Sequence, residues 1–247
     1  YVFGPGVFEG SMRGLFSMLF GAGMFIFVTR LEKRTTGLMP AELFLRRQLW
    51  LLLFGIFHAY VLLWYWDILY HYAICGIILF AFRRLSPKYL LIGAAVCLVL
   101  MTVRENRDLY KRKDVITKGE IVATIDTTKV KLTDLQKEQL GAFTEFKDKS
   151  KPEEKKKEME KQEKEIRGSY AGLYEARSKQ AEEGETFGMY YWAIFDVTLF
   201  MFIGLAFFKL GILQGEAKTK VYAWMAVIGL GVGLPLSYLF VIYDVNY

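Results

Sequence analysis

Long apolar segments alternate with short polar connections along this chain. Crossing the hydrocarbon core of a bilayer takes about 20 mostly apolar residues in a helix. Six segments come near this requirement, namely residues 14–29, 48–65, 68–82, 89–103, 190–213 and 221–243. The third and fourth are short, so we expect one of them to tilt or to have its ends covered by protein. The pattern predicts an all-α, polytopic transmembrane helix bundle of about six spans.

A dense run of charged residues interrupts this pattern. Residues 104–188 hold 20 of the 32 Lys and Arg residues and 19 of the 26 Asp and Glu residues. Thr133 and Gln136 have capping-box spacing, and Pro152 opens a run of Glu and Lys at helical spacing. We therefore predict a mainly helical, solvated insert. The predicted domains are transmembrane helices 1–4 (residues 1–103), the charged insert (residues 104–188) and transmembrane helices 5–6 (residues 189–247).

The positive charge outside the insert lies between the apolar segments. Twelve basic and seven acidic residues remain there, and eleven of the twelve fall on one side of the predicted membrane. They are Arg30, Lys33, Arg34, Arg46, Arg47, Arg83, Arg84, Lys88, Lys209, Lys218 and Lys220. Lys and Arg accumulate in cytoplasmic connections, so we place these inside and the insert outside. The net charge of +6 thus indicates membrane topology and a lipid bilayer as partner, not nucleic acid.

Ionisable residues occur in the apolar stretch "GIFHAYVLLWYWDILYHYAICG", residues 55–76. Such groups are costly within spans and are therefore candidates for function. His58 lies about two helical turns inside the outer end of the second span, and Asp67 lies at the turn into the third. Arg13 lies at the outer end of the first span. We predict that His58 acts as a general base or nucleophile, that Asp67 orients it, and that Arg13 holds an anionic group.

Other residues at the same face are candidate substrate contacts. They are Trp64, Trp66, Tyr70, His71 and Asp196. Asp196 lies inside the fifth span, where we expect it to pair with Arg13 or His58. The aromatic residues also fit an interfacial belt, and His71, one turn after Asp67, also fits a structural role.

Structural interpretations of the main candidates stay open as well. His58 fits a hydrogen bond between packed helices, Asp67 fits a helix cap, and Arg13 fits an interfacial anchor. Five glycines in the apolar segments, Gly21, Gly23, Gly229, Gly231 and Gly233, indicate close helix contacts. The sequence contains no metal-binding spacing, phosphate-binding loop or nucleophile elbow.

Three stretches resemble the DUF418 (YeiB-like) family of bacterial membrane proteins. They are "RGLFSMLFGAGMFIF" (13–27), "RRQLWLLLFGIFHAYVLLWYWDILYHYAICGIILFAFRRLSP" (46–87) and "DVTLFMFIGLAFFKLGIL" (196–213). The family's Gly-x-x-His helix and "DIL" turn match Gly55, His58 and Asp67. Trp66 departs from the glycine that is usual before the Asp. The family's first helix and its C-terminal helices have no counterpart here, so we expect this chain to be a fragment of a longer protein.

The resemblance implies an activity as well as a fold. The family is similar to transmembrane acyltransferases, which move an acyl group from a cytoplasmic carrier, such as acyl-CoA, to an extracytoplasmic acceptor. By this resemblance His58 is the acyl-accepting or general-base group, Asp67 its orienter, and Arg13 the group that stabilises the carrier or the developing anion. It also implies the bacterial cytoplasmic (inner) membrane as location. A transporter or proton-coupled permease, with His58, Asp67 and Asp196 as relay groups, is the alternative.

Overall fold

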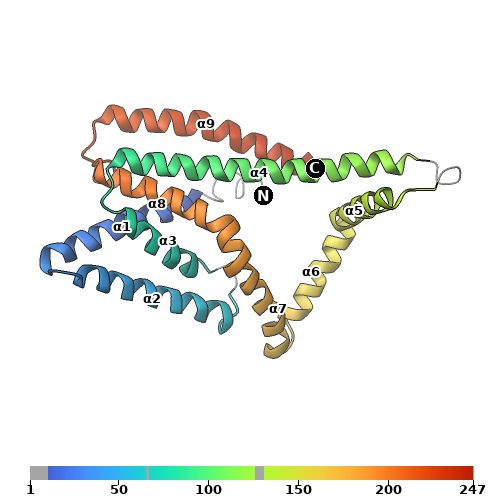
Figure 1. Ribbon diagram of the computed structural model, residues 1–247, viewed down its shortest axis with the longest axis horizontal. Helices are drawn as coiled ribbons and strands as arrows, with labels where there is room; N and C mark the ends of the chain where they lie inside the picture. The colour runs from blue at the N-terminus through green and yellow to red at the C-terminus, as the bar shows by residue number, and fades with distance from the viewer. Residues whose placement is uncertain (1–10, 65–66, 126–130, 247) are drawn as a thin grey trace.

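The computed structural model describes residues 11–64, 67–125 and 131–246 (Figure 1). All regular elements in these ranges are helical, which confirms the predicted all-α class. The helices are α1 (Ser11–Arg34), α2 (Met39–Tyr60), α3 (Leu69–Phe82), α4 (Pro87–Ala123), α5 (Asp134–Ser150), α6 (Pro152–Ile166), α7 (Tyr170–Glu183), the π-helix η2 (Gly184–Ala193), α8 (Ile194–Lys209) and α9 (Thr219–Asn246).

Helix α8 forms the centre of the bundle. It packs against α1, α3 and α4, and its buried side chains Val197, Met201 and Leu205 recur every four residues. This spacing places them on one face of a helix, and the same helix also buries Leu199, Phe202 and Ala206 elsewhere on its circumference. A helix that is apolar on several faces is expected to be surrounded by other helices or by lipid.

Two glycines permit the close approach of α1 and α8. A Cβ atom at Gly21 would lie against the carbonyl oxygen of Met201, and one at Gly204 would lie against the backbone of Met18. The prediction of close helix contact therefore holds at Gly21, and Gly204 is a contact that it missed. It is wrong for the other four glycines, because a Cβ atom added there would meet no atom within 4 Å among the described residues. These are Gly23, Gly229, Gly231 and Gly233.

Four helices of the described residues are long and apolar enough to cross a membrane. They span Met12–Arg34, Pro87–Ala123, Tyr170–Lys209 and Thr219–Leu239. Helix α3 is apolar but has only 14 residues, and α2 carries Glu42, Arg46 and Arg47 in its first half. The chain is thus an integral membrane protein, and the count of six spans stays a prediction.

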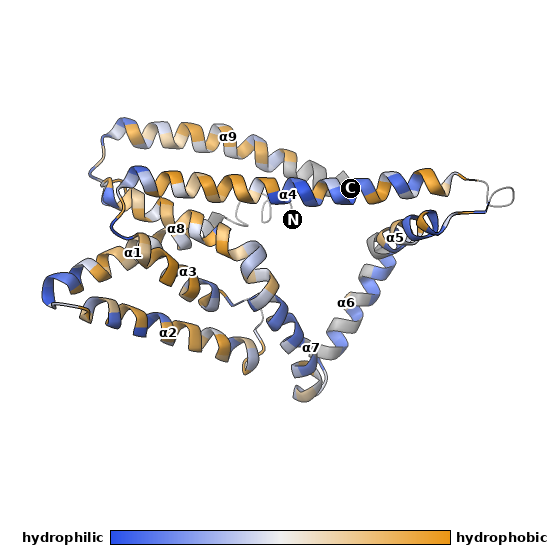
Figure 2. Ribbon diagram, viewed as in Figure 1, coloured by the Kyte–Doolittle hydropathy of each residue, from blue (hydrophilic) through white to orange (hydrophobic). Residues whose placement is uncertain are grey.

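The charged insert leaves and rejoins the bundle without a break in helical structure. Helix α4 has 37 residues, about 55 Å of helix, and hydrophilic residues are frequent in its second half (Figure 2). The predicted domain boundary at residues 103 and 104 thus falls inside one helix. Thr133 and Gln136 form the predicted capping box at the start of α5, and α6 begins at Pro152 as predicted. Helices α7, η2 and α8 then follow one another as one rod back into the bundle (Figure 1).

The basic connections lie together at one end of the bundle. The α1–α2, α3–α4 and α8–α9 turns are on the left in Figure 1. At this end the ammonium group of Lys209 donates hydrogen bonds of 2.6 Å to the carbonyl oxygens of Arg83 and Leu85, after the end of α3. The first residues of α3, which carry the candidate site, therefore lie at the opposite end.

Candidate functional site

His58 and Asp67 are in contact. The Nδ1 atom of His58 lies 3.3 Å from the Oδ1 atom of Asp67. A carboxylate only accepts hydrogen bonds, so Nδ1 carries the proton and Nε2, on the far side of the ring, keeps its lone pair when the ring is neutral. The His58 side chain is 38% exposed and that of Asp67 only 10%. The base is thus accessible while its carboxylate partner is shielded.

Asp67 also bonds to the start of the following helix, from the position before the N-cap residue Ile68. Its Oδ2 atom accepts a hydrogen bond of 3.1 Å from the backbone N–H of Leu69, the first residue of α3. Asp67 is therefore not the N-cap residue that one interpretation made it, but it can bond to the helix start and hold His58 at the same time, because each contact uses a different carboxylate oxygen. This second bond fixes the carboxylate that holds the His58 ring.

Local packing explains why His58 reaches Asp67. A Cβ atom at Gly55, one turn before His58, would lie 2.6 Å from the backbone nitrogen of Tyr70, so only glycine lets α2 approach α3 this closely. Helix α2 then ends in a turn in which Leu63 has a φ of 57° and a buried side chain. The backbone N–H of Trp64 donates to the carbonyl oxygen of His58 in this turn, at 2.9 Å. The Gly-x-x-His spacing thus has a physical reason.

The first part of the rod from the insert covers this end of the bundle. The Tyr170 hydroxyl, at the start of α7, donates to the carbonyl oxygen of Val61 at 2.7 Å. The Glu185 carboxylate of η2 lies near the Tyr60 hydroxyl, and one oxygen of that carboxylate is buried without a hydrogen-bond partner. The sequence offered no signal for Glu185, because it is one of 19 acidic residues in the charged segment.

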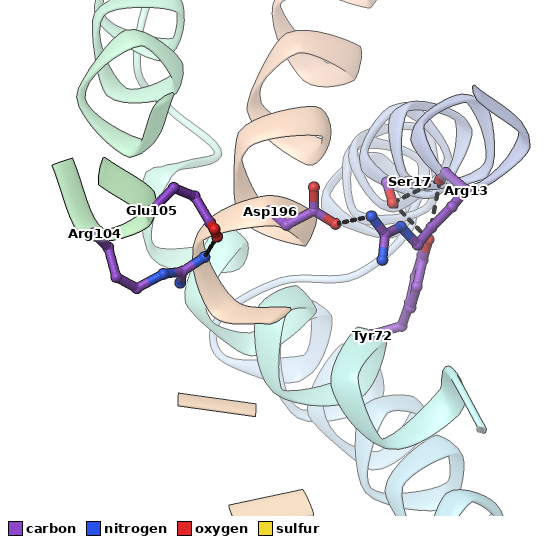
Figure 3. A network of polar contacts seen from close by, with 6 residues as sticks. All are labelled: Arg13, Ser17, Tyr72, Arg104, Glu105 and Asp196. Atoms are coloured by element: carbon purple, nitrogen blue, oxygen red, sulfur yellow. Dashed lines mark hydrogen bonds and ion pairs between the residues drawn. The ribbon is translucent and has the colours of Figure 1, made fainter. Parts of the chain in front are cut away.

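Arg13 and Asp196 form a second cluster (Figure 3). The Arg13 Nη2 atom lies 3.1 Å from the Asp196 Oδ2 atom, joining the start of α1 to the first turn of α8. The Ser17 hydroxyl donates to the carbonyl oxygen of Arg13 at 2.9 Å and lies 2.5 Å from the Tyr72 hydroxyl. Of the two partners expected for Asp196, the structure gives Arg13. No signal in the sequence pointed to Ser17 or Tyr72, because each lies within the apolar pattern of a helix.

Arg104 extends this cluster on the α4 side (Figure 3). Its Nη2 atom lies 2.9 Å from the Glu105 Oε1 atom, and the side chain is 11% exposed. Its guanidinium lies over the rings of Tyr191 and Trp192, at 4.7 and 4.4 Å from their centroids. Cation–π contacts of this kind hold a buried guanidinium against the π-helical segment.

The predicted site residues thus divide into two groups. His58 and Asp67 are in contact, and Arg13 forms its ion pair with Asp196. Tyr72 connects this second group to the first turn of α3 beside His71. Arg13 and Asp196 meet because α8, which carries Asp196, packs directly on α1.

The aromatic candidates surround the first group unevenly. The Trp64 side chain is 64% exposed, whereas Tyr70 is half-buried and its ring meets that of His71 edge-on at 5.8 Å. Trp66 lies outside the described residues. Among the residues that are described, no three His, Cys, Asp or Glu side chains are grouped as a metal site.

Comparison with known proteins gives a partial match. The chain is 44% identical over 89 residues, 36% of its length, to the uncharacterized protein YxaH of Bacillus subtilis (strain 168). It spans only 21% of the length of that relative. No family model matches the chain, and no solved structure matches it.

Proposed function

We propose that this chain belongs to a membrane acyltransferase in which His58 receives or activates the transferred group. The observation that carries the proposal is the His58–Asp67 contact at the end of the bundle opposite the basic connections. Asp67 orients the ring through Nδ1 and would stabilise the positive charge that develops on it. The resemblance of residues 13–27, 46–87 and 196–213 to DUF418 proteins supports the same reading.

The proposed reaction uses Nε2 of His58. Its lone pair attacks the carbonyl carbon of a thioester such as acyl-CoA, the N–C bond forms, and the C–S bond breaks as the thiolate leaves and takes a proton from water. A hydroxyl or amine of the extracytoplasmic acceptor then attacks the acyl-imidazole, loses its proton and regenerates His58. In the variant with general-base catalysis, Nε2 takes the acceptor proton as the acceptor attacks the thioester directly. The C–S bond then breaks, and the imidazolium gives its proton to the leaving thiolate.

The roles of the remaining candidates follow from their contacts. The Arg13 side chain is 57% exposed and can be reached by the donor. To bind an anionic group of the donor, Arg13 would exchange its partner Asp196 for that group. A proton relay of the permease type would need proton transfer between Asp196 and His58. Its pairing with Arg13 supports this alternative less well than the acyltransferase.

The test is acyl transfer by the full-length protein in sealed membrane vesicles supplied with radiolabelled acetyl-CoA. Label retained on the protein, or transferred to vesicle components, should fall at least about 100-fold in His58→Ala, the scale of a lost general base. Asp67→Asn should lose about tenfold or more by the same reasoning. Asp114→Asn, in the outer half of α4, is the matched control for removing an exposed carboxylate.

Retention of full transfer by a correctly folded His58→Ala protein would overturn the assignment. Uptake of a solute driven by a pH gradient, lost in the same variant, would favour the permease instead.

A further inference from the structure

His71 lies between Asp67 and the segment that returns from the insert. Its Nδ1 atom lies 3.1 Å from the backbone carbonyl oxygen of Asp67, and its Nε2 atom lies 3.4 Å from that of Gly184, 113 residues later. Asp67 precedes α3, and Gly184 is the first residue of η2. The ring therefore bridges two segments that are remote in the sequence.

Both acceptors of His71 are carbonyl oxygens, which accept hydrogen bonds and never donate them. Each contact therefore needs an N–H on the ring nitrogen that makes it. A neutral imidazole has one N–H and the imidazolium has two. The two contacts are satisfied together only by the protonated ring.

The groups around His71 come from three elements. The Asp67 carboxylate contacts His58 of α2, Glu185 follows Gly184 in η2, and the ring of Tyr70 in α3 stands edge-on to that of His71. The carboxylates of Asp67 and Glu185 are the negative charges available to compensate a cation. Among the described residues, neither carboxylate forms an ion pair with Lys or Arg. His58 is thus the basic side chain that contacts the Asp67 carboxylate.

The place of the bridge also indicates function. Gly184 is where the rod changes from α-helix to a ten-residue π-helix, and π-helical segments occur often at functional sites. The same segment carries Glu185 toward Tyr60 and ends beside Arg104. His71 therefore connects the segment that approaches both polar clusters to the residue that orients His58.

We propose that His71 is a positioning residue that acts in its doubly protonated form, holding η2 against the start of α3 and fixing the peptide group of Asp67. Loss of the proton leaves one N–H for two acceptors, so one contact breaks. The importance of this for His58 rests on the proposed function; the bridge itself does not.

The bridge is tested by hydrogen–deuterium exchange of the full-length protein in lipid nanodiscs. Protection factors of residues 184–189, corrected for the intrinsic pH dependence of exchange, are compared at about pH 5.5 and about pH 8, on either side of the ordinary titration range of histidine. Wild-type protection should fall about tenfold at the higher pH, because a charge-assisted hydrogen bond is lost.

Two variants isolate the proton on His71. His71→Lys keeps a cation with several donors at both pH values, so protection should stay high and independent of pH. His71→Gln is neutral at both, so protection should be low and equally flat. His58→Gln removes the other histidine of the chain and should keep the wild-type pH dependence.

The inference is wrong if wild-type protection is flat, or if His71→Gln keeps the wild-type pH dependence. If His71→Gln does not fold, the His71→Lys variant tests the inference. If its protection still falls at high pH, a residue other than His71 causes the pH dependence. Absence of acyl transfer together with a normal His71 response removes the proposed function and leaves the bridge. Acyl transfer through His58, together with wild-type hydrogen exchange that does not depend on pH, would support the proposed function and overturn the bridge.

Discussion

Helices α8 and α9 are both apolar and both carry glycine, yet only α8 is packed inside the protein. Eight residues of α8 are buried, whereas no described side chain of α9 is buried. Helix α8 has Gly204 against the backbone of Met18 and Asp196 paired with Arg13. A Cβ atom added at any of the three glycines of α9 would meet no atom within 4 Å among the described residues, and residues 221–243 contain no charged residue.

The difference shows that insertion of a helix into a membrane and packing of that helix against other helices are separate properties, which the hydrophobic pattern of the sequence does not distinguish. Hydrophobicity is enough to place a helix in a bilayer, but it does not drive one helix against another there, because lipid is as apolar as Leu. Association comes from close van der Waals contact at small residues and from polar groups that find partners. Helix α8 has both features on the faces that meet α1, and α9 has neither among the described residues.

The largest expected effect is at the close contact of α8. Gly204→Ala should lower the free energy of unfolding by about 3 kcal/mol, because the new methyl group would overlap the backbone of Met18 and force α1 and α8 apart. Unfolding of the purified protein in mixed micelles measures this loss. Gly23→Ala, in α1 but facing open space, is the matched control. An unchanged stability of Gly204→Ala would mean that the two helices do not pack as described.

A smaller effect is expected at the polar anchor of α8. Arg13→Ala should destabilise the protein by about 1–2 kcal/mol, because Asp196, with a side chain only 14% exposed, loses its partner. Combining it with Asp196→Asn should recover part of the loss, which a double-mutant cycle in the same assay detects.

The control for this anchor is an exposed ion pair of the insert. Lys118→Ala removes the partner of Asp114, whose side chain is 57% exposed, and should cost about 0.5 kcal/mol or less. If both single variants lose the same amount, Arg13 and Asp196 form no anchor.

The smallest effect is expected in α9. Gly231→Ala should leave the unfolding free energy of the bundle unchanged within about 0.5 kcal/mol, because the added methyl group meets nothing. The same chemical change thus has a large effect in α8 and none in α9. A loss comparable to that of Gly204→Ala would show that α9 packs tightly against another surface.

Much of the local structure could be predicted because its causes lie close together in the sequence. The capping box of Thr133 and Gln136 and the start of α6 at Pro152 depend on residues a few positions apart. The contact of His58 with Asp67 is also semi-local, since it crosses one hairpin of two consecutive helices. Helical class and membrane character follow from hydrophobic length alone.

The partners of remote residues could not be predicted in this way. Pairing of Arg13 with Asp196 joins the start of α1 to a helix that follows the whole insert. Glu185 resembles its many acidic neighbours in sequence, and only the return of the rod brings it to Tyr60. The contribution of Gly21, and the lack of one from Gly231, depend on which face of each helix meets a neighbour.

The sequence by itself determined that this chain is helical, enters a membrane and carries a histidine and an aspartate at one helical hairpin. Tertiary structure alone decided that α8 is central, that no described side chain of α9 is buried, and that η2 contacts His71. The physical reason is that hydrophobic length and helix capping act within a few residues. Close glycine contacts, buried ion pairs and carbonyl acceptors become specific only when distant helices come together.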